Sequence, residues 1–476
     1  MIIEESRIIK MLERRLGPSE IFCEEETLTR YSHDTSLVQP CKPVCVIRPS
    51  SVEDVRAVLQ ICNRYKVPVI PFSTGLNNQG LSVPSEPGVV LDLSHLNRIL
   101  DIDEDSWMAR IEPGVTFDNL NEEASKRGLR ALTPYEWPSK ASVISTYLDY
   151  QALFSWPRYK IDIMTTLTLI LPSGEVLKTG TAAVPMAKYP YTSAFGVPFA
   201  GLMDYLWFGS QGTLGVVVEG AIKLKPIRER NEVLFINFDD FDEVHKALRE
   251  IMWQRSPKEL VVLNAFESAL FFSEKPEDVP GLLRSMPKYV VILTLRGPNR
   301  EVEFELEDLK DLSRKMGFKL RDELEGVKNA PEKVLREIAK PQGWIGKARY
   351  KGRRVTIPFI TLTRRIKMLE SKVFGLSERY SYPKAEIGLA VIPVEIGRAY
   401  CQVSFSFEAG AEVERLRAMV RETVRELMDS GAFFDKPYPL WADMVYERCP
   451  TYFRVIRKFK EIVDPNRILN PGKLCL

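Results

Sequence analysis

The chain has 476 residues, of which 45% are hydrophobic and 27% charged, and 66 basic side chains nearly balance 64 acidic ones. This length exceeds one ordinary core, so we expect two domains of a globular protein, and a net charge of +2 argues against a nucleic-acid partner. No apolar run reaches the roughly 18 residues of a membrane-spanning helix, and the N-terminal segment mixes charged with apolar residues, unlike a signal peptide. The sequence therefore predicts a cytoplasmic protein with no transmembrane segment.

The first half of the chain predicts short helices and strands in alternation. Apolar residues recur at helical spacing over 52–65, and a buried strand is expected at 67–70. A second helix is predicted over 116–128, and 163–180 has the pattern of a hairpin with a Pro-Ser-Gly turn. Residues 208–227 read as a glycine-rich loop followed by two strands.

The second half predicts longer strands that alternate with longer helices. This order occurs at 231–255, at 288–317 and at 399–431. Along 399–407, apolar side chains alternate with polar ones, which predicts a strand that covers a core on one face only. Antiparallel strands backed by helices are expected, whereas the basic segment 325–365 has no assigned fold.

The seven cysteines and three histidines do not form a metal motif. The cysteines are scattered without a C-x-x-C pair, and the histidines lie far apart in sequence. We predict no metal site, and we interpret the cysteines as buried or idle thiols.

The stretch "PFSTGLNNQG", residues 71–80, follows the strand predicted at 67–70. Glycine permits positive φ, and small side chains let an anion approach backbone N–H groups, so this loop is a candidate for binding a pyrophosphate. It has neither the Walker pattern nor the Rossmann fingerprint. An ordinary turn has the same composition, so the loop needs support from its neighbours.

That support comes from six blocks that follow one another in order. They are "PSSVEDVRAVLQICNRYKVPVIPFSTGLNNQG", "GVVLDLSHLNRILDID", "ARIEPGVTFDNLNEEASKRGL", "LILPSGEVLKTG", "FGSQGTLGVVVEGAIKLKP" and "VDPNRILNPGK". Together they resemble the FAD-binding fold of the vanillyl-alcohol oxidase and p-cresol methylhydroxylase superfamily. The resemblance implies an α+β chain with a two-subdomain FAD-binding fold and an antiparallel α+β cap. We expect the FAD-binding domain at 1–226, the cap or substrate domain at 227–442, and a return to the FAD-binding domain at 443–476.

The resemblance also implies which residues hold FAD. The loop would offer its backbone to the pyrophosphate, and further segments would line the rest of the cofactor. The expected FAD-binding residues are Ser73, Thr74, Gly75, Leu76, Asn77, Asn78, Gly80, Pro113, Gly114, Ser142, Val143, Val216, Val217, Asn470 and Lys473. For the valines, plain core packing is the alternative. Residues 71–80 contain no histidine, which excludes the covalent attachment that some relatives make in this loop.

Candidate catalytic residues lie near the C-terminus. In the phenol-oxidising branch a Tyr-Arg pair stabilises a phenolate, and Tyr452 falls at the matching position, but Phe453 replaces the arginine and Arg454 follows it. The nearby Tyr446 and Arg448 are further candidates. For Tyr452, half-buried packing is the alternative.

A basic run at 345–354, "IGKARYKGRR", has two readings. Its arginines would suit a carboxylate substrate, because a guanidinium binds two oxygens at once. The alternative is a solvated face or a surface on which a partner docks.

Three functions follow from the resemblance. The first is an FAD-dependent oxidoreductase that oxidises a small alcohol or 2-hydroxy acid by hydride transfer to flavin N5. The second is oxidation of a 4-alkylphenol or aromatic alcohol. The third is a flavoprotein or structural subunit of a multi-subunit electron-transfer complex. The expected partners are a small-molecule substrate and an electron-acceptor protein or iron–sulfur subunit, and an oligomer is compatible with the sequence. The histidine-rich motifs of the metal-assisted D-2-hydroxyacid dehydrogenases are absent from the sequence, which disfavours that subclass.

Overall fold

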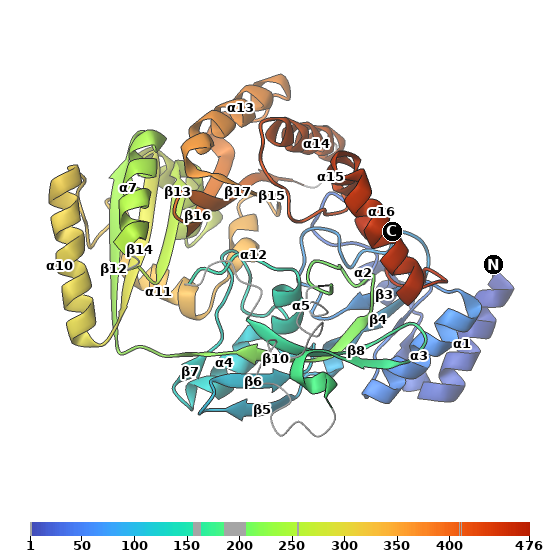
Figure 1. Ribbon diagram of the computed structural model, residues 1–476. Coiled ribbons are helices and arrows are strands. Elements are labelled where there is room, and N and C mark those ends of the chain that lie inside the picture. The colour runs from blue at the N-terminus through green and yellow to red at the C-terminus, as the bar shows by residue number, and fades with distance from the viewer. Residues whose placement is uncertain (1, 156–162, 185–205, 255–256, 409, 411) are drawn as a thin grey trace.

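The computed structural model describes residues 2–155, 163–184, 206–254, 257–408, 410 and 412–476. Figure 1 shows two regions, one built on small sheets at the bottom right and one built on a large sheet at the upper left. The C-terminal helices run from the upper region back down to the lower one. The predicted α+β fold with an antiparallel cap is confirmed, whereas the boundaries at 226 and 442 stay predictions.

The lower region contains a four-stranded and a five-stranded sheet. The first has the order β1-β2-β4-β3, with β2, β4 and β3 parallel, and the second has the antiparallel order β5-β6-β10-β8-β9. A two-stranded ribbon joins β11 to β7. The strands are β1 Ile21–Phe22, β2 Cys45–Ile47, β3 Val69–Phe72, β4 Val89–Asp92, β5 Ile99–Asp103, β6 Met108–Ile111, β7 Leu129–Arg130, β8 Met164–Ile170, β9 Val176–Lys178, β10 Val216–Lys223 and β11 Lys225–Pro226.

Among the described residues, five helices accompany these sheets. They are α1 Ile2–Leu16, α2 Glu25–Arg30, α3 Val52–Tyr65, α4 Phe117–Ser125 and α5 Val143–Leu148. Two of them, α3 and α4, lie where the sequence predicts helices. Helix α3 begins where expected because the Asp54 N–H donates to the Ser51 hydroxyl, which caps the first turn. It ends at Lys66, which adopts a left-handed conformation. Its buried face packs on the four-stranded sheet in one apolar cluster with α1.

The upper region is one antiparallel six-stranded sheet of order β12-β14-β13-β16-β17-β15. The strands are β12 Arg230–Phe238, β13 Glu259–Asn264, β14 Tyr289–Gly297, β15 Arg353–Leu362, β16 Ile387–Glu395 and β17 Arg398–Phe407. The helices are α7 Phe241–Gln254, α8 Ala265–Phe272, α9 Val279–Ser285, α10 Asn299–Met316, α11 Ala330–Ala339, α12 Gly343–Ala348, α13 Ile366–Arg379, α14 Val413–Asp429, α15 Ala442–Arg448 and α16 Pro450–Val463. The segment without an assigned fold thus supplies α11, α12 and β15.

Both faces of the six-stranded sheet are buried. Along β12, Leu234 and Ile236 belong to one apolar core and Val233 and Phe235 to another, as the alternation of a strand requires. Strand β17 was predicted to cover a core on one face only, and in the structure both of its faces are buried. Its apolar side chains enter the first core, while its polar ones, Gln402, Ser404 and Ser406, are buried on the opposite face. Of these three, Gln402 lines a space shared with the loop at 71–80, whereas Ser404 donates to Glu267 and the backbone of Ser406 bonds to Tyr382, both in the upper region.

The C-terminal segment completes the lower region. The N–H of Val69 donates to the carbonyl of Ile468, and the N–H of Asn470 donates back to the carbonyl of Val69. The tail therefore lies beside β3, the strand that leads into the loop at 71–80.

Candidate functional site

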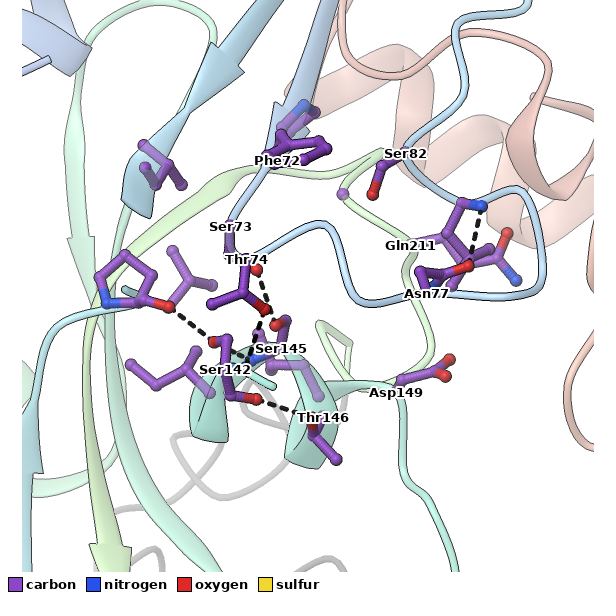
Figure 2. Close-up of a pocket in the computed structure, with 18 of the residues that line it drawn as sticks. Phe72, Ser73, Thr74, Asn77, Ser82, Ser142, Ser145, Thr146, Asp149 and Gln211 are labelled. Carbon is purple, nitrogen blue, oxygen red and sulfur yellow. Dashed lines mark hydrogen bonds between the residues drawn. The ribbon is translucent and has the colours of Figure 1, made fainter. Parts of the chain in front are cut away.

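A cleft opens between the loop at 71–80, α5 with the residues that flank it, residues 207–217 and Asn470. Its empty space, counted with its open mouth, is about 970 Å³. Figure 2 shows the loop and α5 facing each other across part of this cleft.

Hydroxyl groups join the loop to α5. The N–H of Ser142 donates to the Thr74 hydroxyl at 3.1 Å, and the hydroxyls of Ser73 and Ser145 lie 2.9 Å apart (Figure 2). Gly75 has a φ of +68°, and a Cβ there would lie 2.2 Å from the Phe72 ring. The loop is therefore held in a conformation that only glycine fits at its tightest point.

Most of the predicted cofactor residues line this cleft, and the others do not. Those on its wall are Ser73, Thr74, Gly75, Leu76, Asn77, Pro113, Ser142, Val216, Val217 and Asn470. Those off its wall are Asn78, Gly80, Gly114, Val143 and Lys473. Two of the off-wall residues hold the end of the loop and the residues after it: Gly80 N–H donates to Asp34, and the Lys473 ammonium donates to the carbonyl of Val83. Direct contact of any of the fifteen with FAD stays a prediction.

Three buried polar atoms on the wall fit a bound dinucleotide. Trp207 Nε1, Gln211 Oε1 and Asn470 Oδ1 have no hydrogen-bond partner among the described residues. Buried polar groups are costly when unpaired, so a ligand rich in donors and acceptors suits this cleft. FAD, with its phosphates, ribityl hydroxyls and ring nitrogens, is such a ligand.

The four predicted catalytic residues lie away from this cleft. Tyr452 is 63% exposed on α16, and Arg454 is exposed beside it. Tyr446 stacks on Phe453 with ring centroids 4.5 Å apart, and Arg448 pairs with Asp429. No contact among the described residues brings these four to the cleft, and their catalytic role stays an unsupported prediction.

Asp149, which the sequence analysis missed, lies on the cleft wall just beyond α5 (Figure 2). The Tyr438 hydroxyl and the Gln151 amide both donate to its Oδ2, at 2.8 and 2.5 Å. Burial raises the pKa of this carboxyl to about 6, against the opposing charge of Lys436. A carboxylate with that pKa is suited to take a proton near neutral pH.

A second, smaller space adjoins the cleft, and its empty volume, counted with its open mouth, is about 250 Å³. Trp137 lines both spaces, and Tyr438, the hydrogen-bond partner of Asp149, lines the second. The wall comes from the loop at 71–80 on one side and from β15 and β17 on the other. We call this space the polar cavity, because four of its lining atoms are buried without a hydrogen-bond partner among the described residues: Asn78 Oδ1, Trp344 Nε1, Thr356 Oγ1 and Gln402 Oε1.

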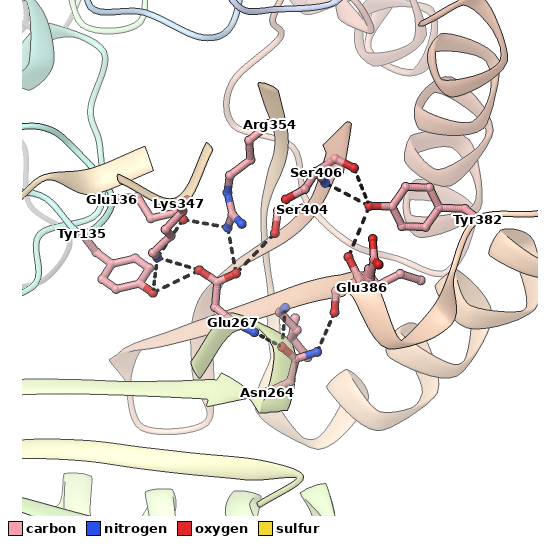
Figure 3. A network of polar contacts seen from close by, with 12 residues as sticks. Tyr135, Glu136, Asn264, Glu267, Lys347, Arg354, Tyr382, Glu386, Ser404 and Ser406 are labelled. Atoms are coloured by element: carbon pink, nitrogen blue, oxygen red, sulfur yellow. Dashed lines mark hydrogen bonds and ion pairs between the residues drawn. The ribbon is translucent and has the colours of Figure 1, made fainter. Parts of the chain in front are cut away.

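A buried ion-pair network lies beside the polar cavity (Figure 3). Lys347 Nζ donates to Glu136 at 2.9 Å and to Glu267 at 2.6 Å, and Arg354 Nη2 donates to both carboxylates at 2.8 Å. Burial disfavours the charge on Glu267, but the cations Arg354 and Lys347 outweigh it and lower the pKa of this carboxyl. Glu136, whose φ is +65°, lines the cavity. The network thus fixes one wall of the cavity across the two regions.

This network corrects the reading of 345–354 as a solvated or docking face. Lys347 and Arg354 are at most 6% exposed, and Lys351 pairs with Glu386. The partners of these three residues come from other parts of the chain, so part of the run is neutralised inside the fold, whereas Arg349 is exposed and Arg353 is half-buried.

Two further absences hold for the described part of the chain. It contains no helix long and apolar enough to cross a bilayer. Within the same residues, no group of three His, Cys, Asp or Glu side chains is arranged to hold a metal ion.

Asn470 offers a test of the cleft. Its side-chain N–H groups donate to the carbonyls of Leu81 and Gln211 at 3.1 and 2.7 Å, and so tie the tail to two walls. Asn470→Asp keeps the shape but sets a carboxylate against two carbonyl oxygens. We expect FAD affinity to fall by about 10- to 100-fold, the loss of two hydrogen bonds. FAD titration of the apoprotein, followed by fluorescence, measures it. Asn466→Asp, at an exposed residue of the same tail, is the control, and equal affinity in both variants would contradict the assignment.

Sequence and structure comparisons agree with this geometry. An FAD binding domain model matches residues 43–180, and a model of the C-terminal domain of FAD linked oxidases matches 442–474. The glycolate oxidase subunit GlcD of Bacillus subtilis is 27% identical over 60% of this chain, and this chain spans only 58% of that relative. The 4-cresol dehydrogenase flavoprotein subunit of Pseudomonas putida is 22% identical over 99% of this chain and 95% of its own. The structure of p-cresol methylhydroxylase with substrate bound superposes with a TM-score of 0.84 at 18% identity, covering 98% of this chain and 96% of that chain.

The fold and the cleft define an FAD-binding flavoprotein. The chain contains an FAD binding domain and the C-terminal domain of FAD linked oxidases, it has the fold of p-cresol methylhydroxylase, and its cofactor is FAD.

Proposed function

We propose that this flavoprotein oxidises a small alcohol or 2-hydroxy acid bound in the polar cavity. FAD in the cleft supplies the hydride acceptor, its N5 atom. The observation that carries the proposal is the position of Asp149, a carboxylate with a raised pKa at the junction of the cleft and the cavity. Asp149 takes the proton of the substrate hydroxyl, while Tyr438 and Gln151 hold the carboxylate in place.

The polar cavity favours a substrate that carries oxygen atoms besides the reacting hydroxyl. Four buried atoms of the cavity without a hydrogen-bond partner among the described residues offer acceptors and donors to such a ligand. They are Asn78 Oδ1, Trp344 Nε1, Thr356 Oγ1 and Gln402 Oε1. A site with buried polar groups rejects analogues that leave those groups unpaired. A 2-hydroxy acid, with a hydroxyl and a carboxylate on adjacent carbons, satisfies more of these groups than a hydrocarbon chain does.

A second candidate, oxidation of a 4-alkylphenol or aromatic alcohol, has support of its own. Tyr400, Tyr438, Trp137 and Trp344 give the cavity aromatic walls, and the similarity to the 4-cresol dehydrogenase flavoprotein subunit spans nearly the whole chain. Burial keeps the pKa of both tyrosines well above the usual value, so they stay hydrogen-bond donors at neutral pH. The phenolic candidate does not explain the unpaired polar atoms that β15 and β17 contribute to the cavity, Thr356 Oγ1 and Gln402 Oε1.

An electron-accepting partner, either a cytochrome or an iron–sulfur subunit, and a cytoplasmic location belong to the proposal as well. The relatives include proteins named as subunits. The described contacts of 345–354 leave Lys347 and Arg354 inside the protein, so a partner would dock elsewhere.

The test begins with the visible spectrum of the purified protein before and after acid precipitation. Flavin bands in the supernatant establish bound, non-covalent FAD, and bands in the pellet establish a covalent link. Anaerobic mixing with lactate, glycolate, aromatic alcohols and 4-ethylphenol then follows the loss of flavin absorbance. Reduction by a hydroxy acid supports the first candidate, and reduction by 4-ethylphenol alone supports the second. A protein that binds FAD but is reduced by none of these compounds contradicts both substrate assignments.

Thr356→Val tests the polar cavity directly. The change removes one unpaired hydroxyl without altering the volume, so we expect KM for the hydroxy acid to rise about 2- to 10-fold, the value of one hydrogen bond, with FAD affinity unchanged. Thr361→Val is a matched control, because Thr361 lies on the same strand with an unpaired buried hydroxyl but does not line the cavity. An identical KM in both variants, or a lower KM for 4-ethylphenol only, would favour the phenolic candidate.

A further inference from the structure

Two cysteines lie opposite each other at the edge of the four-stranded sheet. Strands β1 and β2 are antiparallel, and their register pairs Ile21 with Ile47 and Phe22 with Val46. Strand β1 ends at Phe22, and the same register continued by one residue sets Cys23 opposite Cys45. Successive pairs alternate between the two faces of a sheet, so these two side chains project on the same face as Ile21 and Ile47.

The hydrogen bonds place this pair where side chains approach most closely. The N–H of Arg48 donates to the carbonyl of Glu20 at 2.9 Å, which makes that pair hydrogen-bonded. Hydrogen-bonded and non-hydrogen-bonded pairs alternate, so Cys23 and Cys45 form a non-hydrogen-bonded pair, with Cα atoms about 4.5 Å apart in regular geometry. Disulfides span Cα separations of about 4.4 to 6.8 Å. The backbone therefore already has the spacing that a cross-strand disulfide needs.

The two thiols differ in exposure and in acidity. Cys23 is exposed and Cys45 is fully buried. A side-chain hydrogen bond from Cys45 lowers the pKa of Cys23 to about 7, and the same contact raises the pKa of Cys45. Cys475 is also exposed, but burial of its sulfur raises its pKa. Cys23 is thus the reactive thiol and Cys45 the thiol placed to resolve it.

We propose that Cys23 and Cys45 are a dithiol that peroxide converts to a reversible disulfide. The Cys23 thiolate attacks the peroxide, an S–O bond forms as the O–O bond breaks, and water leaves. Cys45 then loses its proton and attacks the Cys23 sulfur, so that an S–S bond forms and a second water leaves. Two electrons pass from the thiols to one peroxide, and a dithiol reductant reverses the change. This site is independent of the proposed substrate oxidation.

The disulfide would tie β1 covalently to β2. Strand β2 pairs with β4, and β4 pairs with β3, the strand that leads into the loop at 71–80. Oxidation would therefore fix the N-terminal segment to the sheet that carries the cofactor loop.

The experiment uses the full-length flavoprotein and mass mapping of its cysteine peptides. With iodoacetamide at pH 7, we expect Cys23 to be alkylated at least about tenfold faster than Cys475, since near half of Cys23 is thiolate there. With one equivalent of hydrogen peroxide, a non-reducing digest should show a linked Cys23–Cys45 peptide that dithiothreitol removes. In Cys475→Ser the linked peptide should form equally well.

Two variants keep the test decisive. In Cys45→Ser the linked peptide should disappear, and with an excess of peroxide, at least two equivalents, Cys23 should accumulate as the sulfinic acid. In Cys23→Ser, a change at an exposed position, Cys45 should stay a thiol after the same peroxide treatment. The proposal is overturned if wild-type Cys23 reaches the sulfinic acid while Cys45 is still free after unfolding, or if Cys23 reacts no faster than Cys475.

Discussion

Replacing Asp149 by asparagine should lower kcat/KM for the hydroxylated substrate by about 10²- to 10⁴-fold, the usual contribution of a positioned base. The amide keeps the shape of the side chain and its place beside Tyr438, but it cannot take a proton. Because the base acts only when ionised, wild-type kcat/KM should rise with pH through about 6 and then level off. Asp149→Asn should lose that limb and still bind FAD, and steady-state rates between pH 5 and 8 measure both effects.

Asp443→Asn is the matched control for this change. Asp443 pairs with Arg421 at the start of α15 and lines neither space, so its loss should leave the rate and the pH profile unchanged. If Asp149→Asn keeps more than a tenth of wild-type kcat/KM, or keeps the limb near pH 6, another group takes the proton.

Arg354→Met should lower the free energy of unfolding by about 3–5 kcal/mol, the cost of leaving a buried charge without its partner. The change leaves two buried carboxylates, Glu136 and Glu267, to share Lys347 alone. Adding Glu267→Gln to this variant restores neutrality, so we expect the double variant to recover part of the loss. Denaturant unfolding followed by circular dichroism measures all three proteins.

Arg353→Met is the control on the same strand. Arg353 is half-buried beside Arg354 and belongs to none of the four ion pairs of this network, so its replacement should change stability by no more than about 0.5 kcal/mol. A loss as large in Arg353→Met as in Arg354→Met would show that the strand, and not the ion pairs, is sensitive.

The same ion-pair network predicts that acid lowers the stability of the fold. The folded pKa of Glu267 lies below its usual value of 4.5, so its contribution to stability is present above that value and is lost as pH falls through the folded pKa.

Patterns of neighbouring residues in the sequence correctly predicted the features that depend on neighbouring residues. Helix α3 begins and ends where its capping serine and its apolar spacing indicate, and the loop at 71–80 lies on the predicted cleft. Asp149 escaped notice because its role depends on Tyr438, which is 289 positions away in the sequence. The basic run at 345–354 was misread for the same reason, since Glu136 pairs with Lys347 across 211 positions.

Motif spacing alone also led to candidate catalytic residues that the fold places away from the cleft. Counting back from the tail motif led to Tyr452 on the exposed face of α16, whereas the tyrosine beside the cleft is Tyr438, in the turn before α15. The polar side chains of β17 were visible in the sequence, but only the fold shows that one of them, Gln402, lines a cavity.

Because the C-terminal tail pairs with β3, the FAD cleft can be completed only after the tail has been synthesised. Asn470 closes the cleft by a hydrogen bond to Leu81, 389 positions earlier in the chain. At a synthesis rate of about 5–20 residues per second, roughly 20–80 s pass between the synthesis of Leu81 and that of Asn470. FAD capture is therefore expected only after Asn470 has been synthesised and has folded against β3, and a chain truncated before this residue should be colourless.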